Sequence, residues 1–321
     1  MMLSRVADSL YWMSRYLERA EHTARLMEVQ INLLLDRSPV SEDQRWHHAM
    51  SLLGLTDDGS SELDGKAVIH RLAFDVTHAS SILSSLMSAR ENARQVREQI
   101  SSEMWEQVNR LYHKVRQTDL NSMAESNPFE FLVTVREGVH LFKGVTNSTM
   151  THGEGYEFIR LGRYLERTRA LAILIGAHFR EFPLPPDGDI GTGEHLEWIG
   201  LLRCCTAFEA YCKFYGADPR PDWVAEFLLL NPRFPHSLRY SVNCAAHSLI
   251  AISETSAERR KSEANRLIGR MQASVEFAEI GEVLTGGVQE FLDSIQKQCA
   301  AVHEALYLTY IDYPIEAALA G

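Results

Sequence analysis

The pentapeptide Arg-Tyr-Leu-Glu-Arg occurs twice in this chain, at residues 15–19 and again at residues 163–167. Each copy lies within a long segment whose apolar residues recur with the spacing of an α-helix. An Arg and a Glu that are three residues apart share one face of a helix, so each copy places charge along a helix long enough to contact several neighbours. The repeat therefore predicts two duplicated helices that face one another.

The first copy belongs to a longer charged face. At about 100° per residue, one stripe of the helix carries Tyr11, Arg15, Glu18, His22 and Arg25. This stripe has three interpretations. It is a solvated face with weak ion pairs, a buried reciprocal Arg–Glu lattice that fixes the register of the two helices, or a functional site. In a site, the guanidinium groups would hold a carboxylate or phosphate, and Glu18 or His22 would transfer a proton.

The chain as a whole is predicted to be all-α, because almost every periodic segment has the helical spacing and no run of alternating β-branched residues occurs. Residue pairs typical of helix starts support this prediction: Ser41 with Gln44, Ser88 with Glu91, Asn127 before Pro128 and Glu130, and Thr255 with Glu258. The predicted helices lie near 4–35, 42–54, 62–74, 77–99, 102–118, 128–150, 154–180, 193–215, 221–230, 236–254, 257–274 and 286–310.

A chain of 321 residues that is 45% hydrophobic can bury one large core. We expect a single helical domain over residues 1–321, a large multi-helix bundle with two related halves. The duplication places these halves at 1–152 and 153–321, each with one Arg-Tyr-Leu-Glu-Arg helix. Six prolines and glycines between 182 and 193 cannot continue a helix and predict a linker or crossover there.

Charge and cysteine content narrow the classes of partner. The formal net charge of −11 argues against general binding to nucleic acid or to anionic membranes. No run approaches the roughly 20 apolar residues of a membrane-spanning helix. The five cysteines are an odd number and no secretory leader is present, so a disulfide framework is not expected. These features predict a cytoplasmic protein.

Outside the repeats, Arg90, Arg94 and Arg97 follow Ser88 at helical spacing. They could grip a phosphate or carboxylate, or pair with the surplus of acidic residues. No metal is expected, since His140 and His152 on one helix would be about 18 Å apart. Phosphate-loop and dinucleotide motifs are absent. The chain is therefore expected to have no cofactor of its own, and ATP with Mg²⁺ would be bound only by a partner.

Four separated segments together resemble the bacterial alpha-E family, a helical domain with a repeated Glu-Arg motif. They are SRVADSLYWMSRYLERAEHTARL, ARENARQVREQIS, the second RYLER, and EFLLLNPRFPHSLRY. The resemblance runs from Leu3 to about Tyr310. It implies a circularly permuted ATP-grasp ligase as partner, often with a transglutaminase-like protein, and thus formation of an amide or peptide bond on a small peptide or amino-acid-derived substrate.

The leading hypothesis is a helical component of such a ligase system, with a polar cleft between the two repeat helices. Glu18, His22 and Glu166 would orient the substrate or transfer a proton. The residues that would clamp an anionic substrate are Arg15, Arg19, Arg163 and Arg167, with Arg90 and Arg94 as secondary contributors. If the chain is itself an enzyme, acyl or amide transfer or hydrolysis is expected. The alternative is a noncatalytic scaffold that docks the ligase, with the Glu–Arg pairs as structural salt bridges.

Overall fold

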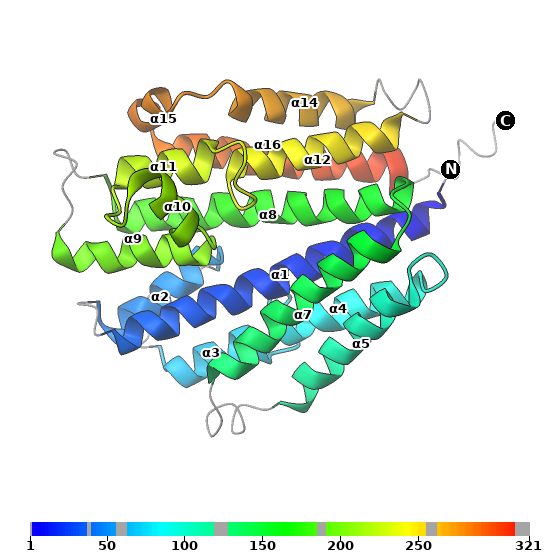
Figure 1. The fold of residues 1–321 in the computed structure, drawn as a ribbon, viewed down its shortest axis with the longest axis horizontal. Coiled ribbons are helices and arrows are strands. Elements are labelled where there is room, and N and C mark those ends of the chain that lie inside the picture. Colours follow the sequence, from blue (N-terminus) through cyan, green and yellow to red (C-terminus); the bar gives the residue numbers. More distant parts are fainter. Residues whose placement is uncertain are drawn as a thin grey trace.

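Two long helices, α1 (Ser4–Leu35) and α8 (Glu154–Glu181), lie beside each other through the middle of the molecule (Figure 1). The computed structural model describes residues 2–36, 40–55, 63–118, 128–184, 191–254 and 262–311. Within these ranges the chain forms helices and no strand, so the prediction of an all-α fold is confirmed. One copy of the pentapeptide lies on α1 and the other on α8.

The contact between α1 and α8 is close because a glycine faces it. A Cβ atom at Gly162 would lie 2.3 Å from the carbonyl oxygen of Tyr11 and 2.4 Å from Oγ of Ser14. Both distances are far shorter than van der Waals contact, so a larger residue would push the helices apart. Gly162 directly precedes the second pentapeptide, and its missing side chain lets the charged residues of the two copies reach each other.

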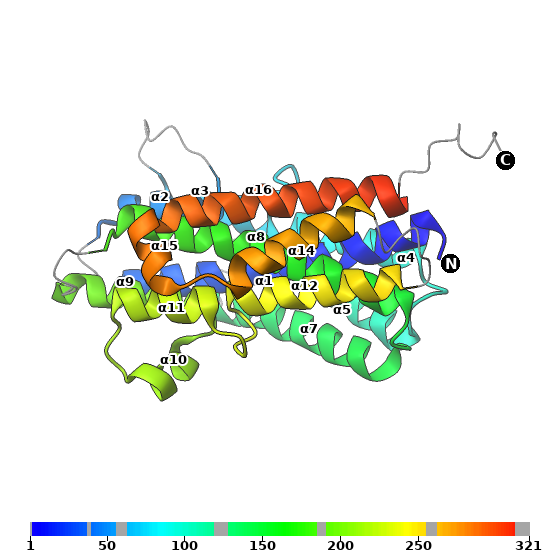
Figure 2. The ribbon, with the colours of Figure 1, turned by 90° about the horizontal axis from the view of Figure 1, so that it is seen from above.

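The other helices pack on two sides of this central pair (Figures 1 and 2). One side holds α4, α5 and α7, with α2 and α3 beside them; the other holds α12, α14 and α16, with α9, α10, α11 and α15 toward one end. Their bounds are α2 Glu42–Leu52, α3 Gly65–Ala73, α4 Ile82–Gln95, α5 Ser102–Gln117, α7 Pro128–Thr149, α9 Thr192–Cys204, α10 Phe208–Tyr215, α11 Pro221–Leu230, α12 Leu238–Ser253, α14 Glu263–Glu276, α15 Ile280–Gly286 and α16 Val288–Leu306, which continues as a π-helical turn, Tyr307–Ile311.

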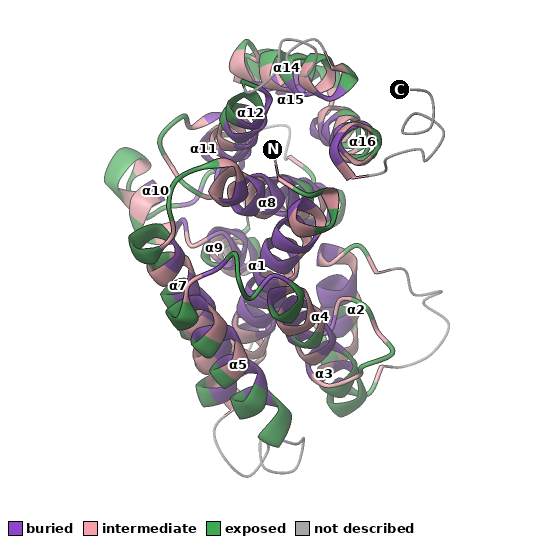
Figure 3. Ribbon diagram, turned by 90° about the vertical axis from the view of Figure 1, so that its right-hand side faces the viewer, coloured by how far each residue is buried: buried purple, intermediate pink, exposed green. Residues whose placement is uncertain are grey.

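Burial follows this arrangement. Seen along the bundle, the helix faces that point inward are buried and the outer faces of α5, α7, α10 and α14 are exposed (Figure 3). Among the described residues, no helix is both long enough and apolar enough to cross a membrane. The core is continuous across both sides of the α1–α8 pair.

The predicted helix over 77–99 is wrong at both ends, since α4 begins at Ile82 and ends at Gln95. Ser81, rather than Ser88, caps this helix: its Oγ accepts a hydrogen bond from the backbone N–H of Ser84 at 3.1 Å. Ser88 lies inside α4, where its carbonyl oxygen accepts from Asn92. Ser81 and Ser88 could each cap a helix on local sequence alone, and the helix begins after Ser81, which is buried at a turn of the chain.

One other predicted helix is divided in two. The segment predicted over 193–215 breaks after Cys204, where Thr206 adopts a left-handed conformation with φ of 52°. The helix predicted over 286–310 is confirmed as α16 with its π-helical turn, while α15, which Gly287 with its φ of 99° separates from α16, has no counterpart among the predicted helices. Ser41 and Gln44 form the predicted capping box. The predicted starts at Asn127 and Thr255 lie outside the described residues.

Candidate functional site

The two copies of the pentapeptide exchange charges across the α1–α8 contact. Glu166 of the second copy lies 2.7 Å from Nε of Arg15 and 2.7 Å from Nε of Arg19, both in the first copy. In return, Glu18 of the first copy lies 2.6 Å from Nε of Arg167 in the second. Glu18 and Glu166 are each 3% exposed. The charged stripe of α1 is therefore a buried, reciprocal set of ion pairs rather than a solvated face.

A lysine from α7 joins this set and links it to a second carboxylate. The ammonium of Lys143 lies 2.7 Å from Oε2 of Glu18 and 2.5 Å from Oε2 of Glu21. Glu21 also contacts His140 of α7 at 2.9 Å and Arg25 of α1 at 3.1 Å. We call the nine charged residues of this layer the Glu–Arg cluster: Arg15, Glu18, Arg19, Glu21, Arg25, Lys143, Arg163, Glu166 and Arg167.

The electrostatics of the cluster keep its carboxylates ionised. Burial alone would raise the pKa of Glu18, but the charges of Arg167 and Lys143 hold it well below its usual range. Burial opposes ionisation of Glu166 in the same way, and Arg15 and Arg19 lower its pKa to about 2. A carboxyl group with so low a pKa is neither a proton donor nor an effective base near neutral pH.

The far side of Arg15 is covered by aromatic groups of α1 and α16. Its Nη1 donates a hydrogen bond to the hydroxyl of Tyr11 at 3.0 Å, and its guanidinium lies 4.6 Å from the ring centroid of Trp12. The same hydroxyl lies 2.9 Å from Nδ1 of His303. Burial and the charge of Arg15 lower the pKa of His303 to about 4, so this imidazole is neutral at pH 7.

His22 lies between two small cavities in the cluster. Its Nε2 is buried and has no hydrogen-bond partner among the described residues, and burial lowers its pKa. One cavity, lined by Glu18, Arg167 and His236 among others, has a volume of about 10 Å³. The other, beside Arg19 and Glu166, has a volume of about 30 Å³. Spaces of this size hold one or two water molecules and no amino acid.

Three predicted site residues lie outside the paired core. Arg163 is near Glu18 and Arg167 but makes no hydrogen bond or ion pair with any described residue, and burial lowers its pKa. Arg90 donates to Oδ1 of Asn109 at 2.7 Å, and Arg94 pairs with Glu91 on the exposed side of α4. These two arginines have their own partners, so the structure gives them no contact with the cluster.

Glu21, Lys143 and His303 belong to the site but were not predicted from the sequence. Lys143 and His303 come from α7 and α16, and no motif in the sequence connects those helices to α1. The only available signal was the position of Glu21 on the same turn as Glu18 and His22. A full guanidinium clamp made by the four repeat arginines is not observed, because three of them are already paired.

Two buried cysteines in the part of the chain that the structure describes are poorly suited to act as nucleophiles. Burial raises the pKa of the Cys204 thiol to about 12 and that of Cys299 to about 11, so both are protonated at neutral pH. No group of three or more His, Cys, Asp or Glu side chains there is arranged to hold a metal ion.

Comparison with known proteins identifies the family. A family model described as a predicted alpha-helical domain with a conserved ER motif, Alpha-E, matches residues 2–311. Glu-Arg dipeptides at 18–19 and 166–167 are the two centres of the reciprocal pairing. No solved structure matches this chain.

Longer relatives are found among mycobacteria. The uncharacterized proteins Mb2597 of Mycobacterium bovis and Rv2567 of Mycobacterium tuberculosis are each 24% identical to this chain over 337 aligned positions. The alignments include 97% of this chain but 37% of each relative, so the chain spans less than half the length of the curated relatives it matches. Because the Alpha-E model covers nearly the whole chain, the protein belongs to the Alpha-E family.

Proposed function

We propose that this protein is a noncatalytic helical component of a cytoplasmic amide-bond-forming system, and that it docks a circularly permuted ATP-grasp ligase. The observation that carries this proposal is the closed pairing of Glu18 and Glu166. Each carboxylate has two cationic partners within 2.7 Å, so both of its oxygens lie against a positive charge. The Glu–Arg pairs then have a structural role, which is to hold α1 and α8 together in one register.

The length of the relatives supports a role beside another domain. In the mycobacterial relatives, the region that matches this chain is about one third of a longer protein. A helical unit that is joined to further chain in some relatives is well suited to act with a separate partner in others. The identity of that partner as an ATP-grasp ligase, and its peptide or amino-acid-derived substrate, come from the family resemblance.

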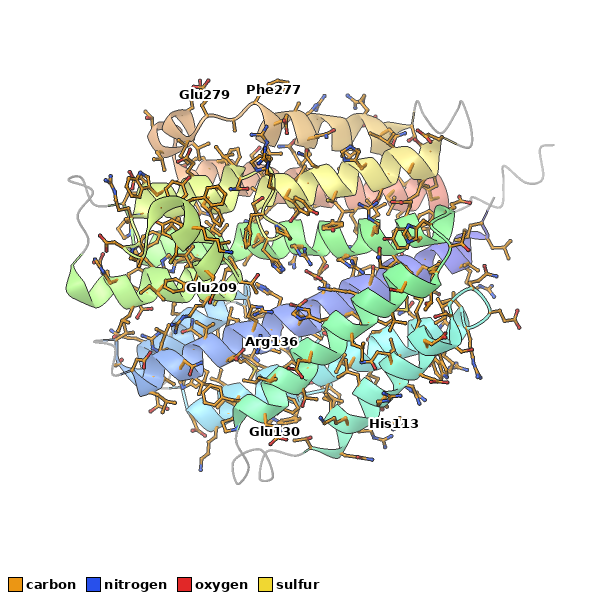
Figure 4. The ribbon with its side chains drawn as sticks, viewed as in Figure 1. His113, Glu130, Arg136, Glu209, Phe277 and Glu279 are labelled. Atoms are coloured by element: carbon orange, nitrogen blue, oxygen red, sulfur yellow. The ribbon has the colours of Figure 1, made fainter. Side chains whose placement is uncertain are left out.

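A hollow on the described surface is suited to docking. It has a volume of about 340 Å³ and lies between α14, α15 and α16, where Phe277 is 81% exposed. Figure 4 shows Phe277 and Glu279 at the outer edge of the molecule, in the connection between α14 and α15. Glu282 lines the hollow as well. An apolar surface with acidic groups beside it fits a partner segment that carries both apolar and basic residues.

Sedimentation velocity with the purified chain and a circularly permuted ATP-grasp protein from the same organism tests the proposal. We expect a complex, which Phe277→Ser weakens. Leu141→Ser is the matched control, since Leu141 is an exposed apolar residue on α7, on the other side of the central pair. Ligase product formation by the mixture should stay within about twofold of wild type when His22→Gln is used. No complex, or loss of product with His22→Gln, contradicts the noncatalytic proposal.

A further inference from the structure

The Glu–Arg cluster has more positive than negative charge. It contains three carboxylates and six cationic side chains, which leaves a surplus of three positive charges in a chain whose formal net charge is −11. The ion-paired cations are poorly accessible, with side chains between 7% and 18% exposed. Uncompensated charge in such surroundings is costly unless a counterion neutralises it.

The ion pairs between the two copies of the pentapeptide show which cation of the Glu–Arg cluster has no anionic partner. If the two copies exchanged equivalent contacts, the pair Arg15–Glu166 would be matched by a pair between Arg163 and Glu18. The second contact does not form: the remaining oxygen of Glu18 is taken by Lys143 at 2.7 Å, while Arg167 holds the first. Arg163 is therefore displaced from its symmetric partner.

Arg163 remains accessible at the edge of the cluster. Its side chain is only partly exposed, and it has no hydrogen-bond or ion-pair partner in the described ranges. Tyr156 and Tyr164, on the same helix, lie near enough to influence it electrostatically. The hydroxyl of Tyr156 donates to Oδ1 of Asn147 at 2.9 Å, so the end of α7 borders this part of α8. Arg163 is thus a half-buried guanidinium beside the paired core.

We propose that Arg163 binds an oxyanion, a carboxylate or phosphate group of a small ligand, at this edge, with the ion-paired Arg167 near it. A guanidinium without a protein partner presents a planar fork of donors that matches either group bidentately. The site holds one anionic group rather than a whole substrate between four arginines. This inference does not depend on the docking of a ligase, because it concerns the chain alone.

Isothermal titration calorimetry of the purified chain with sodium phosphate, and separately with sodium glutamate, tests the site at constant ionic strength. We expect saturable binding of at least one anion, and the arm that binds identifies a phosphate or a carboxylate ligand. Arg163→Gln should weaken binding by about tenfold or more, as expected for loss of charge-assisted hydrogen bonds. Arg163→Lys keeps the charge without the fork and should give an intermediate affinity.

A control variant and a stability measurement show whether a loss of anion binding is specific to Arg163. Arg94→Gln, at an exposed arginine paired with Glu91, is the control for the loss of one positive charge and should bind the anion like wild type. In chloride buffer without either anion, Arg163→Gln should unfold at the same or a higher urea concentration than wild type, because it removes an unpaired cation. Absence of saturable binding by either anion, or unchanged affinity in Arg163→Gln, overturns the proposal.

Discussion

Glu18 and Arg167 form an ion pair of 2.6 Å although 149 residues separate them in the chain. Each belongs to a different copy of the same pentapeptide, so the contact joins two helices that carry the same local sequence. The pairing requires α1 and α8 to meet at one register, because a slip of one residue would turn both side chains away from the contact. We interpret the repeat as a device that specifies how the two central helices pack.

Removal of one carboxylate tests how strongly the fold depends on this device. In Glu166→Gln, the buried guanidinium group of Arg15 and the half-buried one of Arg19 remain without their anion. We expect a loss of about 3–5 kcal/mol in the free energy of unfolding, as for other broken buried pairs. Urea denaturation followed by circular dichroism measures it. The control Glu91→Gln breaks an exposed pair and should cost less than about 1 kcal/mol; equal effects would contradict a structural role.

The close approach of α1 and α8 makes a second prediction. Gly162→Ala places a methyl group 2.3 Å from the carbonyl oxygen of Tyr11, and helix backbone cannot move aside as a flexible side chain can. We expect a destabilisation of about 1–3 kcal/mol. Gly144→Ala in α7 is the matched control, since no atom lies within 4 Å of its new Cβ. It should be neutral or stabilise by up to about 1 kcal/mol. A neutral Gly162→Ala would show that the helices tolerate separation.

The sequence predicted the helices more successfully than their boundaries. Periodicity over 32 residues was sufficient for α1, but the start of α4 depended on a choice between Ser81 and Ser88 that only tertiary packing decides. The break after Cys204 had no signal of its own, since Thr206 adopts a positive φ with neither glycine nor proline present. Such a turn is imposed by the surrounding structure and cannot be read from local propensity.

The candidate site was predictable along the two repeat helices but not beyond them. Helical geometry placed Arg15, Glu18 and His22 on one face of α1, and the structure keeps them there. The repeat predicted that α8 lies across from that face, but no feature of the sequence indicated that α7 and α16 also contact it. Lys143 was consequently not predicted as a site residue. Its contact with Glu18 is the reason why Arg163 does not pair with that carboxylate.

Buried histidines predict a decrease in stability as the pH falls. Burial lowers the pKa of His48 to about 4 from an ordinary value of 6.5. As the pH falls below 6.5, the unfolded state binds a proton that the folded state does not, so stability decreases down to about pH 4 and then levels off for this group. The slope it contributes reaches about 1.4 kcal/mol per pH unit.

His48→Gln removes this contribution. In this variant, the slope of the free energy of unfolding against pH between about pH 6.5 and 4 should decrease by up to about 1.4 kcal/mol per pH unit, the contribution of one proton. Part of the slope should persist, because burial, with the neighbouring His48, also lowers the pKa of His178 in the wild type. His113→Gln is the control, since that residue lies exposed on α5 (Figure 4). An unchanged slope in His48→Gln would contradict the buried, neutral state.

A second buried ion pair can be used to test whether such pairs stabilise the fold or only select how helices pack. Arg45 of α2 and Glu197 of α9 are 1% and 3% exposed, with Nη2 and Oε1 2.6 Å apart, and Nη1 of Arg45 donates to Gln30 of α1. Arg45→Met alone leaves the carboxylate of Glu197 buried without this charge and should cost about 3–5 kcal/mol. Arg45→Met combined with Glu197→Leu should recover most of that loss, because neither charge then remains to be desolvated.

A double-mutant cycle by urea denaturation measures the coupling between these two side chains. Additive losses from the two substitutions would mean that Arg45 and Glu197 stabilise the fold independently, and the ion-pair interpretation would be wrong. A double variant as stable as wild type would show that the pair contributes little net energy. Its role would then be to choose which face of α9 packs on α1, and limited proteolysis of the double variant should show faster cleavage within α9 even where the midpoint of unfolding is unchanged.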